Sequence, residues 1–232
     1  MSYEMQRKIC ESHVCIIGVG GTGSYLALAA VMTGVEKITI VDFDEIELSN
    51  TSRQVLYDES DVGKRKVDVA KEKLEKYNRN VKVNAINVKI ENEEDMQFLK
   101  NDIPNLAILC ADTPRGKIQS IVDRVMQKFS IPWFLYGPYS HSKVSVGPLI
   151  VPGKTKTYEE LFPKSIEIYN DKVKNINQKF VAAICDPYNG FASQFAAIEM
   201  FKILSGYTNS AILNKKYYVD TDTWEIEFDE YD

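Results

Sequence analysis

The feature that most constrains this chain is a glycine-rich segment, GVGGTG at residues 18–23, between an apolar run and a helical pattern. Residues 13–17 (HVCII) predict a buried strand, and residues 24–33 predict a helix. Glycines at such a turn let a phosphate approach the backbone N–H groups at the start of the helix. The segment therefore predicts a nucleotide-binding turn built on Gly18, Gly20, Gly21 and Gly23. The alternative is a tight strand–helix turn without a ligand.

The position of Asp42 favours a turn that binds a nucleotide over a turn without a ligand. It closes a second predicted strand, residues 37–41, at the distance from the glycines where an acid can accept hydrogen bonds from ribose hydroxyls.

Strands and helices alternate through the first half of the chain. Strands are expected at residues 13–17, 37–41, 81–88, 106–110 and 133–136, and helices at 24–33, 64–77, 93–99 and 114–129. This alternation predicts an α/β, Rossmann-like fold, a mainly parallel sheet with helices on both faces. Further on we expect a strand at 143–151, a polar crossover loop at 153–186, a helix at 190–204 and antiparallel C-terminal strands at 216–219 and 224–228. No internal boundary is visible, so we expect a single domain over residues 1–232.

Composition limits the cellular compartment and the kinds of binding partner to be expected for this chain. The chain has 232 residues, 44% of them hydrophobic, which is enough for one full core. A net charge of −5 does not provide the basic surface that binds DNA. No apolar run could span a membrane or serve as a signal peptide, and the four cysteines are scattered. We expect a cytoplasmic protein that binds neither a membrane nor DNA.

The segment after the second strand indicates which nucleotide is bound. VDFDEIELSNTSRQ, residues 41–54, contains Asp44, Asn50, Arg53 and Gln54, and Lys66 follows in VGKRK. A nicotinamide enzyme does not need these cations and amides beside its cofactor. Transfer of an adenylyl group does, because negative charge builds up on the phosphoryl oxygens and on the departing pyrophosphate. The cluster therefore favours ATP.

With these residues the sequence resembles the ThiF/MoeB/HesA family of ubiquitin-activating-like adenylating enzymes. GVGGTGS looks like the family's phosphate loop, DFDEIELSNTSRQ like its D-x-D-x-[IV]-x-x-S-N-L-x-R-Q segment, and VGKRK like its V-G-x-x-K. CADTPRGK resembles its D-x-x-D segment, and GFASQFAAIEMFKILSG resembles the helix behind the site. The resemblance covers about residues 12–228. GPLIVPGKTKTYEELFP further resembles the branch that acts on microcin-like peptides.

The resemblance implies a role for each matched residue. Asp42 would hold the ribose, and Asp112 would bind Mg²⁺. Arg53, Lys66 and Asp112 would be catalytic, with Cys185 a candidate nucleophile that takes the acyl group from the adenylate. The residues expected to bind the nucleotide are Gly18, Gly20, Gly21, Gly23, Asp42, Asp44, Asn50, Arg53, Gln54, Lys66 and Asp112.

Several of these residues have a purely structural alternative. Asn50 and Gln54 could satisfy the loop backbone, and Asp112 could cap a helix that starts at Pro114. A buried small residue is the simpler interpretation of Cys185. Cys15 and Cys110 are expected in the core.

The sequence departs from the family in two places. Thr157 and Glu160 stand where a first CxxC pair would fall, so no structural zinc is expected. Relatives often begin with a longer N-terminal helix that carries an arginine into the partner's site. Here about a dozen residues precede the first strand, and Arg7 is the candidate.

We therefore expect an ATP- and Mg²⁺-dependent adenylyltransferase that acts as a homodimer. Its substrate would be the C-terminal carboxylate of a small carrier protein or peptide, activated for transfer to a thiol, sulfur or amine. One alternative is a non-catalytic pseudoenzyme partner with the same fold. The others are a tRNA-modifying dehydratase, which the lack of a basic face disfavours, and an NAD(P) oxidoreductase, for which no catalytic Tyr/Lys or His/Asp arrangement is found.

Overall fold

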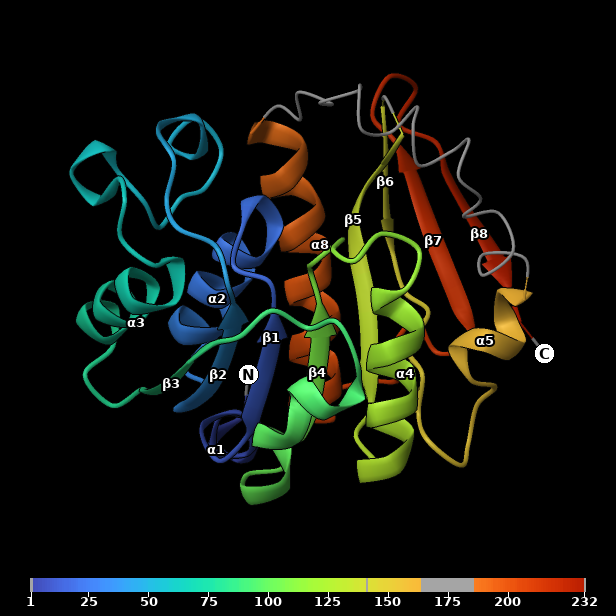
Figure 1. Ribbon diagram of the computed structural model, residues 1–232. Coiled ribbons are helices and arrows are strands. Elements are labelled where there is room, and N and C mark those ends of the chain that lie inside the picture. The colour runs from blue at the N-terminus through green and yellow to red at the C-terminus, as the bar shows by residue number, and fades with distance from the viewer. Residues whose placement is uncertain (1, 141, 164–185, 232) are drawn as a thin grey trace.

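A computed structural model describes residues 2–140, 142–163 and 186–231. One eight-stranded sheet runs through the described residues in the order β3-β2-β1-β4-β5-β6-β7-β8 (Figure 1). Its strands are β1 (His13–Ile17), β2 (Lys37–Asp42), β3 (Lys82–Asn87), β4 (Leu106–Leu109), β5 (Trp133–Ser140), β6 (Lys143–Val146), β7 (Lys215–Asp220) and β8 (Ile226–Glu230). The α-helices of the described residues are α1 (Tyr3–Cys10), α2 (Gly21–Thr33), α3 (Lys66–Tyr77), α4 (Ile118–Phe129), α5 (Tyr158–Leu161) and α8 (Asp186–Ser205). The described residues also form three 3-10 helices, η1 (Leu48–Asn50), η2 (Glu59–Asp61) and η3 (Glu93–Asn101).

Strand pairing confirms the predicted fold class. β3, β2, β1, β4 and β5 are parallel, and β5 to β8 are antiparallel. All five residues of β1 are buried, which is typical of a strand with helices over both faces. β1 lies between β2 and β4, so the chain order reverses beside it. The crevice outside the carboxyl ends of strands at such a switch point is where open α/β sheets bind ligands.

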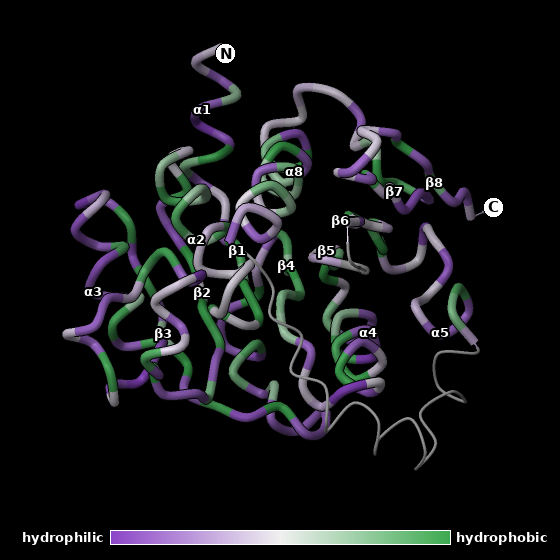
Figure 2. Tube along the Cα trace, turned by 90° about the horizontal axis from the view of Figure 1, so that it is seen from above, coloured by the Kyte–Doolittle hydropathy of each residue, from purple (hydrophilic) through white to green (hydrophobic). Residues whose placement is uncertain are grey.

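Helices cover both faces of the sheet. Figure 2 shows α2 and α8 on one side and α4 on the other. Ile16 of β1 packs in the first core cluster with Leu26 of α2 and Met200 of α8. The next residue, Ile17, packs in the second cluster with Val122 of α4. This division follows from the alternation of side chains along a strand, and it fixes the end of β1 between the two layers.

Some element boundaries differ from those expected. α1 precedes the first strand, where no helix was expected, and its N-terminus is capped by Ser2. α4 begins at Ile118 and not near Pro114, because a turn closed by hydrogen bonds to the Pro114 carbonyl comes first. The strand expected at 143–151 ends at Val146, and that expected at 224–228 runs from Ile226 to Glu230. Of the crossover loop, residues 164–185 lie outside the described residues.

One structural observation bears on the prediction that this protein does not bind a membrane. No helix among the described residues is both long enough and apolar enough to cross a bilayer.

Candidate functional site

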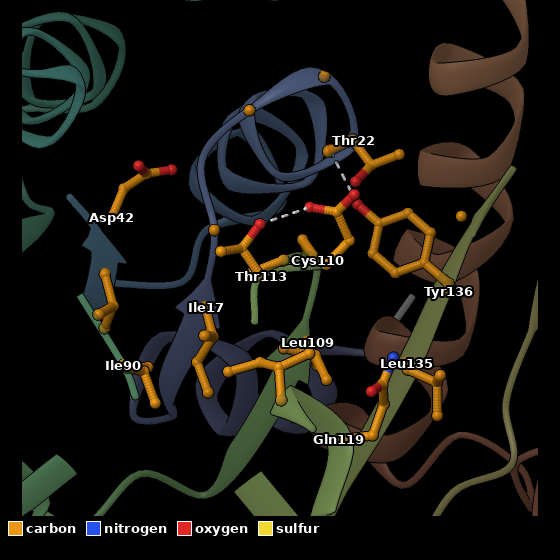
Figure 3. Close-up of a pocket in the computed structure, with 18 of the residues that line it drawn as sticks. Ile17, Thr22, Asp42, Ile90, Leu109, Cys110, Thr113, Gln119, Leu135 and Tyr136 are labelled. Carbon is orange, nitrogen blue, oxygen red and sulfur yellow. Dashed lines mark hydrogen bonds between the residues drawn. The ribbon is translucent and has the colours of Figure 1, made fainter. Parts of the chain in front are cut away.

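A cavity of about 630 Å³ opens at the carboxyl ends of β1, β2 and β4 (Figure 3). Its lining combines the glycine turn with apolar side chains, among them Ile17, Leu109 and Leu135. Most residues predicted to bind the nucleotide line this cavity, namely Gly18, Gly20, Gly21, Asp42, Asp44, Arg53, Gln54, Lys66 and Asp112. Gly23 and Asn50 do not line it.

The glycine turn is determined by steric contacts. Gly18 has φ +93°, and a Cβ atom there would lie 2.8 Å from the backbone nitrogen of Ala111. A Cβ at Gly23 would lie 1.8 Å from the carbonyl oxygen of Gly18. Gly23 is therefore required for the close approach of the backbone within the turn, although it does not line the cavity. No side chain of the described residues caps α2 at Gly20, so the first N–H groups of this helix are left to a ligand or to solvent.

Asp42 joins the end of β2 to the glycine turn. Its Oδ2 accepts a hydrogen bond from the Val19 N–H at 2.8 Å, and its Oδ1 accepts one from the Asp44 N–H at 2.9 Å. Burial raises the pKa of Asp42 above its ordinary value, although nearby Lys66 acts in the opposite direction. Figure 3 shows this carboxylate on the β2 side of the cavity.

Lys66 brings a buried cation to the cavity wall. It is the first residue of α3 and only 5% exposed, and its Nζ donates a hydrogen bond to Asp44 Oδ2 at 2.8 Å. A positive charge at this end of a helix opposes the helix dipole. Asp44 offsets this charge with a carboxylate that is 46% exposed. An anion in the cavity would be attracted by the same cation.

The loop after β2 contains two residues that face the cavity and one that does not. Asn50 is buried, and its Oδ1 accepts the Glu47 N–H at 3.1 Å in a capping box around η1. Arg53 donates to the Ser49 carbonyl oxygen at 2.8 Å and lines the cavity. Gln54 is 4% exposed, and its Oε1 has no hydrogen-bond partner in the described part of the chain. Asn50 thus follows its structural alternative, whereas Gln54 does not.

Asp112 lies on the cavity rim after β4. Its side chain is 79% exposed and lies 3.8 Å from Arg115 Nε. The capping alternative for Asp112 is wrong, because the N-cap of α4 is Lys117. Among the described residues no cluster of three metal-ligating side chains occurs. A single carboxylate still fits Mg²⁺, since this ion takes most of its remaining ligands from water and substrate phosphates.

Two cavity residues were not predicted as such from the sequence: Cys110 was expected in the core, and Tyr136 was not singled out. β4 ends at Leu109, and Cys110, the next residue, is half-buried. It packs against the first core cluster and also lines the cavity, so the core prediction is confirmed only in part. Burial raises the pKa of the Cys110 thiol to about 12, which disfavours the thiolate at neutral pH. Tyr136 donates to the Thr22 carbonyl oxygen at 2.8 Å (Figure 3). Cys15 is fully buried, as predicted.

Asn189, in the first turn of α8, also lines the cavity and was missed. The sequence carried no signal for it, because packing of α8 on α2 brings it there. Cys185 lies outside the described residues.

Thr157 and Glu160 have a structural role at the start of α5. The Thr157 N–H donates to Glu160 Oε2 at 2.7 Å, and the Glu160 N–H donates to Thr157 Oγ1 at 3.3 Å. This reciprocal capping box begins the helix at Tyr158. The positions that would carry a cysteine pair therefore cap a helix here.

The fold and the cavity together define a nucleotide-binding protein of the Rossmann-like class. The model of the ThiF family matches residues 1–232, and the chain belongs to that family. Molybdopterin-synthase adenylyltransferase of Haemophilus influenzae is 27% identical over 203 residues, which are 88% of this chain and 79% of that protein. Sulfur carrier protein adenylyltransferase of Thermus thermophilus is 35% identical over 97 residues, 42% of this chain and 36% of that protein.

Solved structures of Escherichia coli MccB are also similar to this chain. MccB with ATP has a TM-score of 0.86 and 31% identity, and the match covers 98% of this chain and 66% of MccB. The microcin C7 biosynthetic enzyme MccB in complex with N-formylated MccA gives 0.86 and 29%, covering 98% of this chain and 67% of MccB. This chain thus spans about two thirds of MccB. The predicted ThiF-type adenylyltransferase class and the likeness to the microcin branch are confirmed.

Proposed function

We propose that this chain uses ATP and Mg²⁺ to adenylate the C-terminal carboxylate of a peptide or small carrier protein. The observation that supports this most is one continuous cavity wall. It brings together Asp42, the uncapped start of α2, the cations Lys66 and Arg53, and the amide of Gln54. A nucleoside followed by phosphates is the ligand whose charge distribution matches that wall.

Each residue would have a defined part in the reaction. A substrate carboxylate oxygen attacks the α-phosphorus of ATP, the bond from that phosphorus to the bridging oxygen breaks, and an acyl adenylate and pyrophosphate form. Asp42 would accept hydrogen bonds from the ribose, and the N–H groups at the start of α2 would meet phosphoryl oxygens. Lys66 and Arg53 would offset the charge that develops on the leaving pyrophosphate. Asp112 would hold Mg²⁺, which supplies further positive charge when bound.

The kind of substrate is supported by the solved structures. MccB has been crystallised with ATP and with the peptide MccA, and two of the relatives act, by their names, on molybdopterin synthase and on a sulfur carrier protein. A free C-terminal carboxylate is the group that such peptide and carrier substrates would offer to the α-phosphorus. The acyl adenylate would then be consumed when its acyl group is transferred to a thiol, sulfur or amine.

Pyrophosphate exchange tests this function. Purified protein is incubated with ATP, Mg²⁺, labelled pyrophosphate and a panel of peptides encoded by neighbouring genes. Each peptide is supplied with a free C-terminus and, as a matched control, with an amidated one. Exchange should appear with a free peptide and vanish with its amidated form, because only the free carboxylate can attack. ATP binding without exchange across the whole panel would favour the pseudoenzyme.

We further propose that the protein is a homodimer. An apolar groove runs along the outer faces of α2 and α8, where Met32 is 71% and Ile198 is 54% exposed. Its lining in the described part of the chain carries no charged side chain and consists of Ala29, Met32, Thr33, Gln194, Ala197, Ile198 and Phe201. A second copy related by two-fold symmetry could cover both grooves at once. Arg7 is exposed on α1 and does not line this chain's own cavity.

Sedimentation velocity at tens of micromolar tests the dimer. Wild type should sediment as a dimer, and Met32→Glu should shift it to monomer while the melting temperature stays close to that of wild type, since Met32 is mostly exposed. A monomeric wild type would contradict the proposal.

A further inference from the structure

Asn189 is a buried amide without a partner inside the candidate nucleotide cavity. Its side chain lines the cavity, and the residue is only 2% exposed. Its Nδ2 has no hydrogen-bond partner among residues 2–140, 142–163 and 186–231. An unsatisfied buried donor is unfavourable, and such groups are rare in folded proteins. The acceptor for this donor is therefore expected to be supplied by a bound ligand.

The amide lies against the first residue of α2. A Cβ atom added to Gly21 would be 2.8 Å from Asn189 Nδ2 and 3.2 Å from its Cγ. Glycine at position 21 thus leaves the space in which the amide lies. The uncapped N-terminus of α2 begins at the same residue. The Asn189 donor of α8 and the uncapped start of α2 therefore lie side by side, and the ligand group that suits both is an oxyanion.

The first turn of α8 is held in place against α2. Ser193 Oγ lies 3.0 Å from the Thr22 carbonyl oxygen and 2.6 Å from the Asn189 carbonyl oxygen. Tyr25 of α2 donates a hydrogen bond to Asp186 Oδ1 at 2.7 Å. These contacts fix the backbone that carries Asn189. The amide is accordingly pre-organised, and little ordering remains to be done when a ligand binds.

We propose that Asn189 Nδ2 donates a hydrogen bond to a phosphoryl oxygen of the bound nucleotide. The inference rests on the proposed function in taking that ligand to be ATP. Asp42 contacts the turn at Val19, whereas Asn189 contacts it at Gly21. A nucleotide whose ribose lies at Asp42 brings its phosphates along the turn toward Asn189. α8 is then a direct part of the binding site and not merely a helix packed behind it.

Isothermal titration with Mg²⁺ and ATP, and separately with AMP, tests the contact. Asn189→Ala should raise the Kd for ATP about 10- to 100-fold, the range for losing a hydrogen bond to a charged group. Asn189→Asp should raise it further, because a carboxylate would face the phosphate. An equal loss for AMP assigns the contact to the α-phosphoryl group, and a loss for ATP alone assigns it to the distal phosphates. Both results support the proposal.

Ser193→Ala is the matched control. It removes a hydrogen bond between α2 and α8, but Ser193 does not line the cavity. This variant should melt at a lower temperature but lose much less affinity for ATP than Asn189→Ala, because the bond from Tyr25 to Asp186 still holds the first turn of α8. Asn189→Ala should melt close to wild type without nucleotide, because it removes an unpaired donor.

Two results would overturn the inference while leaving the proposed function intact. In the first, wild type binds ATP and both Asn189 variants bind it equally well. In the second, Ser193→Ala loses as much affinity as Asn189→Ala, so that helix position alone explains the effect. A wild type that binds no nucleotide would instead refute the proposed function, and this inference with it.

Discussion

Replacing Lys66 by methionine should separate binding from folding. Removing a cation from the start of α3 stabilises the helix by about 0.3–1 kcal/mol. Losing the ion pair with half-exposed Asp44 costs about 0–1 kcal/mol. Methionine can fill the space of the buried lysine stem. These contributions nearly cancel, so the melting temperature without nucleotide should change by less than about 4 °C for a chain of this size.

The effect of the same change on catalysis should be large. Removing one positioned electrostatic stabiliser typically costs about 2.7–4 kcal/mol in the transition state, or about 10²- to 10³-fold in rate. Pyrophosphate exchange gives the rate, and circular dichroism gives the melting temperature. Lys73→Met is the control in the same helix, since Lys73 pairs with Asp58 and buried Asp61 and does not line the cavity. It should lower stability and leave exchange unchanged. A Lys66→Met protein that melts much earlier yet exchanges normally would refute this reasoning.

Two further predictions concern nucleotide choice and pH. ATP with Mg²⁺ should raise the melting temperature by mass action and NADH should not; stabilisation by micromolar NADH alone would contradict the adenylation site. Burial raises the pKa of Asp42, so the folded state binds a proton more tightly than the unfolded state. The ionised carboxylate therefore disfavours folding above that pKa, and this penalty disappears as the pH falls through it. Wild type should gain stability relative to Asp42→Asn between pH 7 and pH 4 in thermal melts without nucleotide, and a relative loss would show that the sign is wrong.

Much of the fold and of the cavity follows from local sequence patterns. The apolar runs of β1, β2 and β4, and the glycine turn between β1 and α2, each lie within a few residues. Their periodicity and turn chemistry are visible without tertiary information. The parallel pairing then brings the ends of these strands to one edge of the sheet. That is why Asp42 and Asp112, which end different segments, could both be expected at the same cavity.

The features that escaped prediction depend on tertiary contacts or on single-residue boundaries. Asn189 reaches the cavity because α8 packs on α2, and nothing near it in the sequence resembles a phosphate site. Cys110 faces the cavity because β4 stops one residue early. Asn50 is the amide type that could either bind phosphate or close a loop, and its Oδ1 accepts the Glu47 N–H. α1 is too short to be stable alone, and burial of Ile9 holds it against the core.

Pyrophosphate exchange by wild type and by Asp112→Ala is the most direct test of the adenylation site. Asp112 is 79% exposed and does not cap α4, so its loss should change stability by no more than about 0.5 kcal/mol. With a peptide that supports wild-type exchange, Asp112→Ala should fold normally and show no exchange, because the carboxylate that would hold Mg²⁺ against the phosphates is gone. Equal exchange by the two proteins would contradict the account.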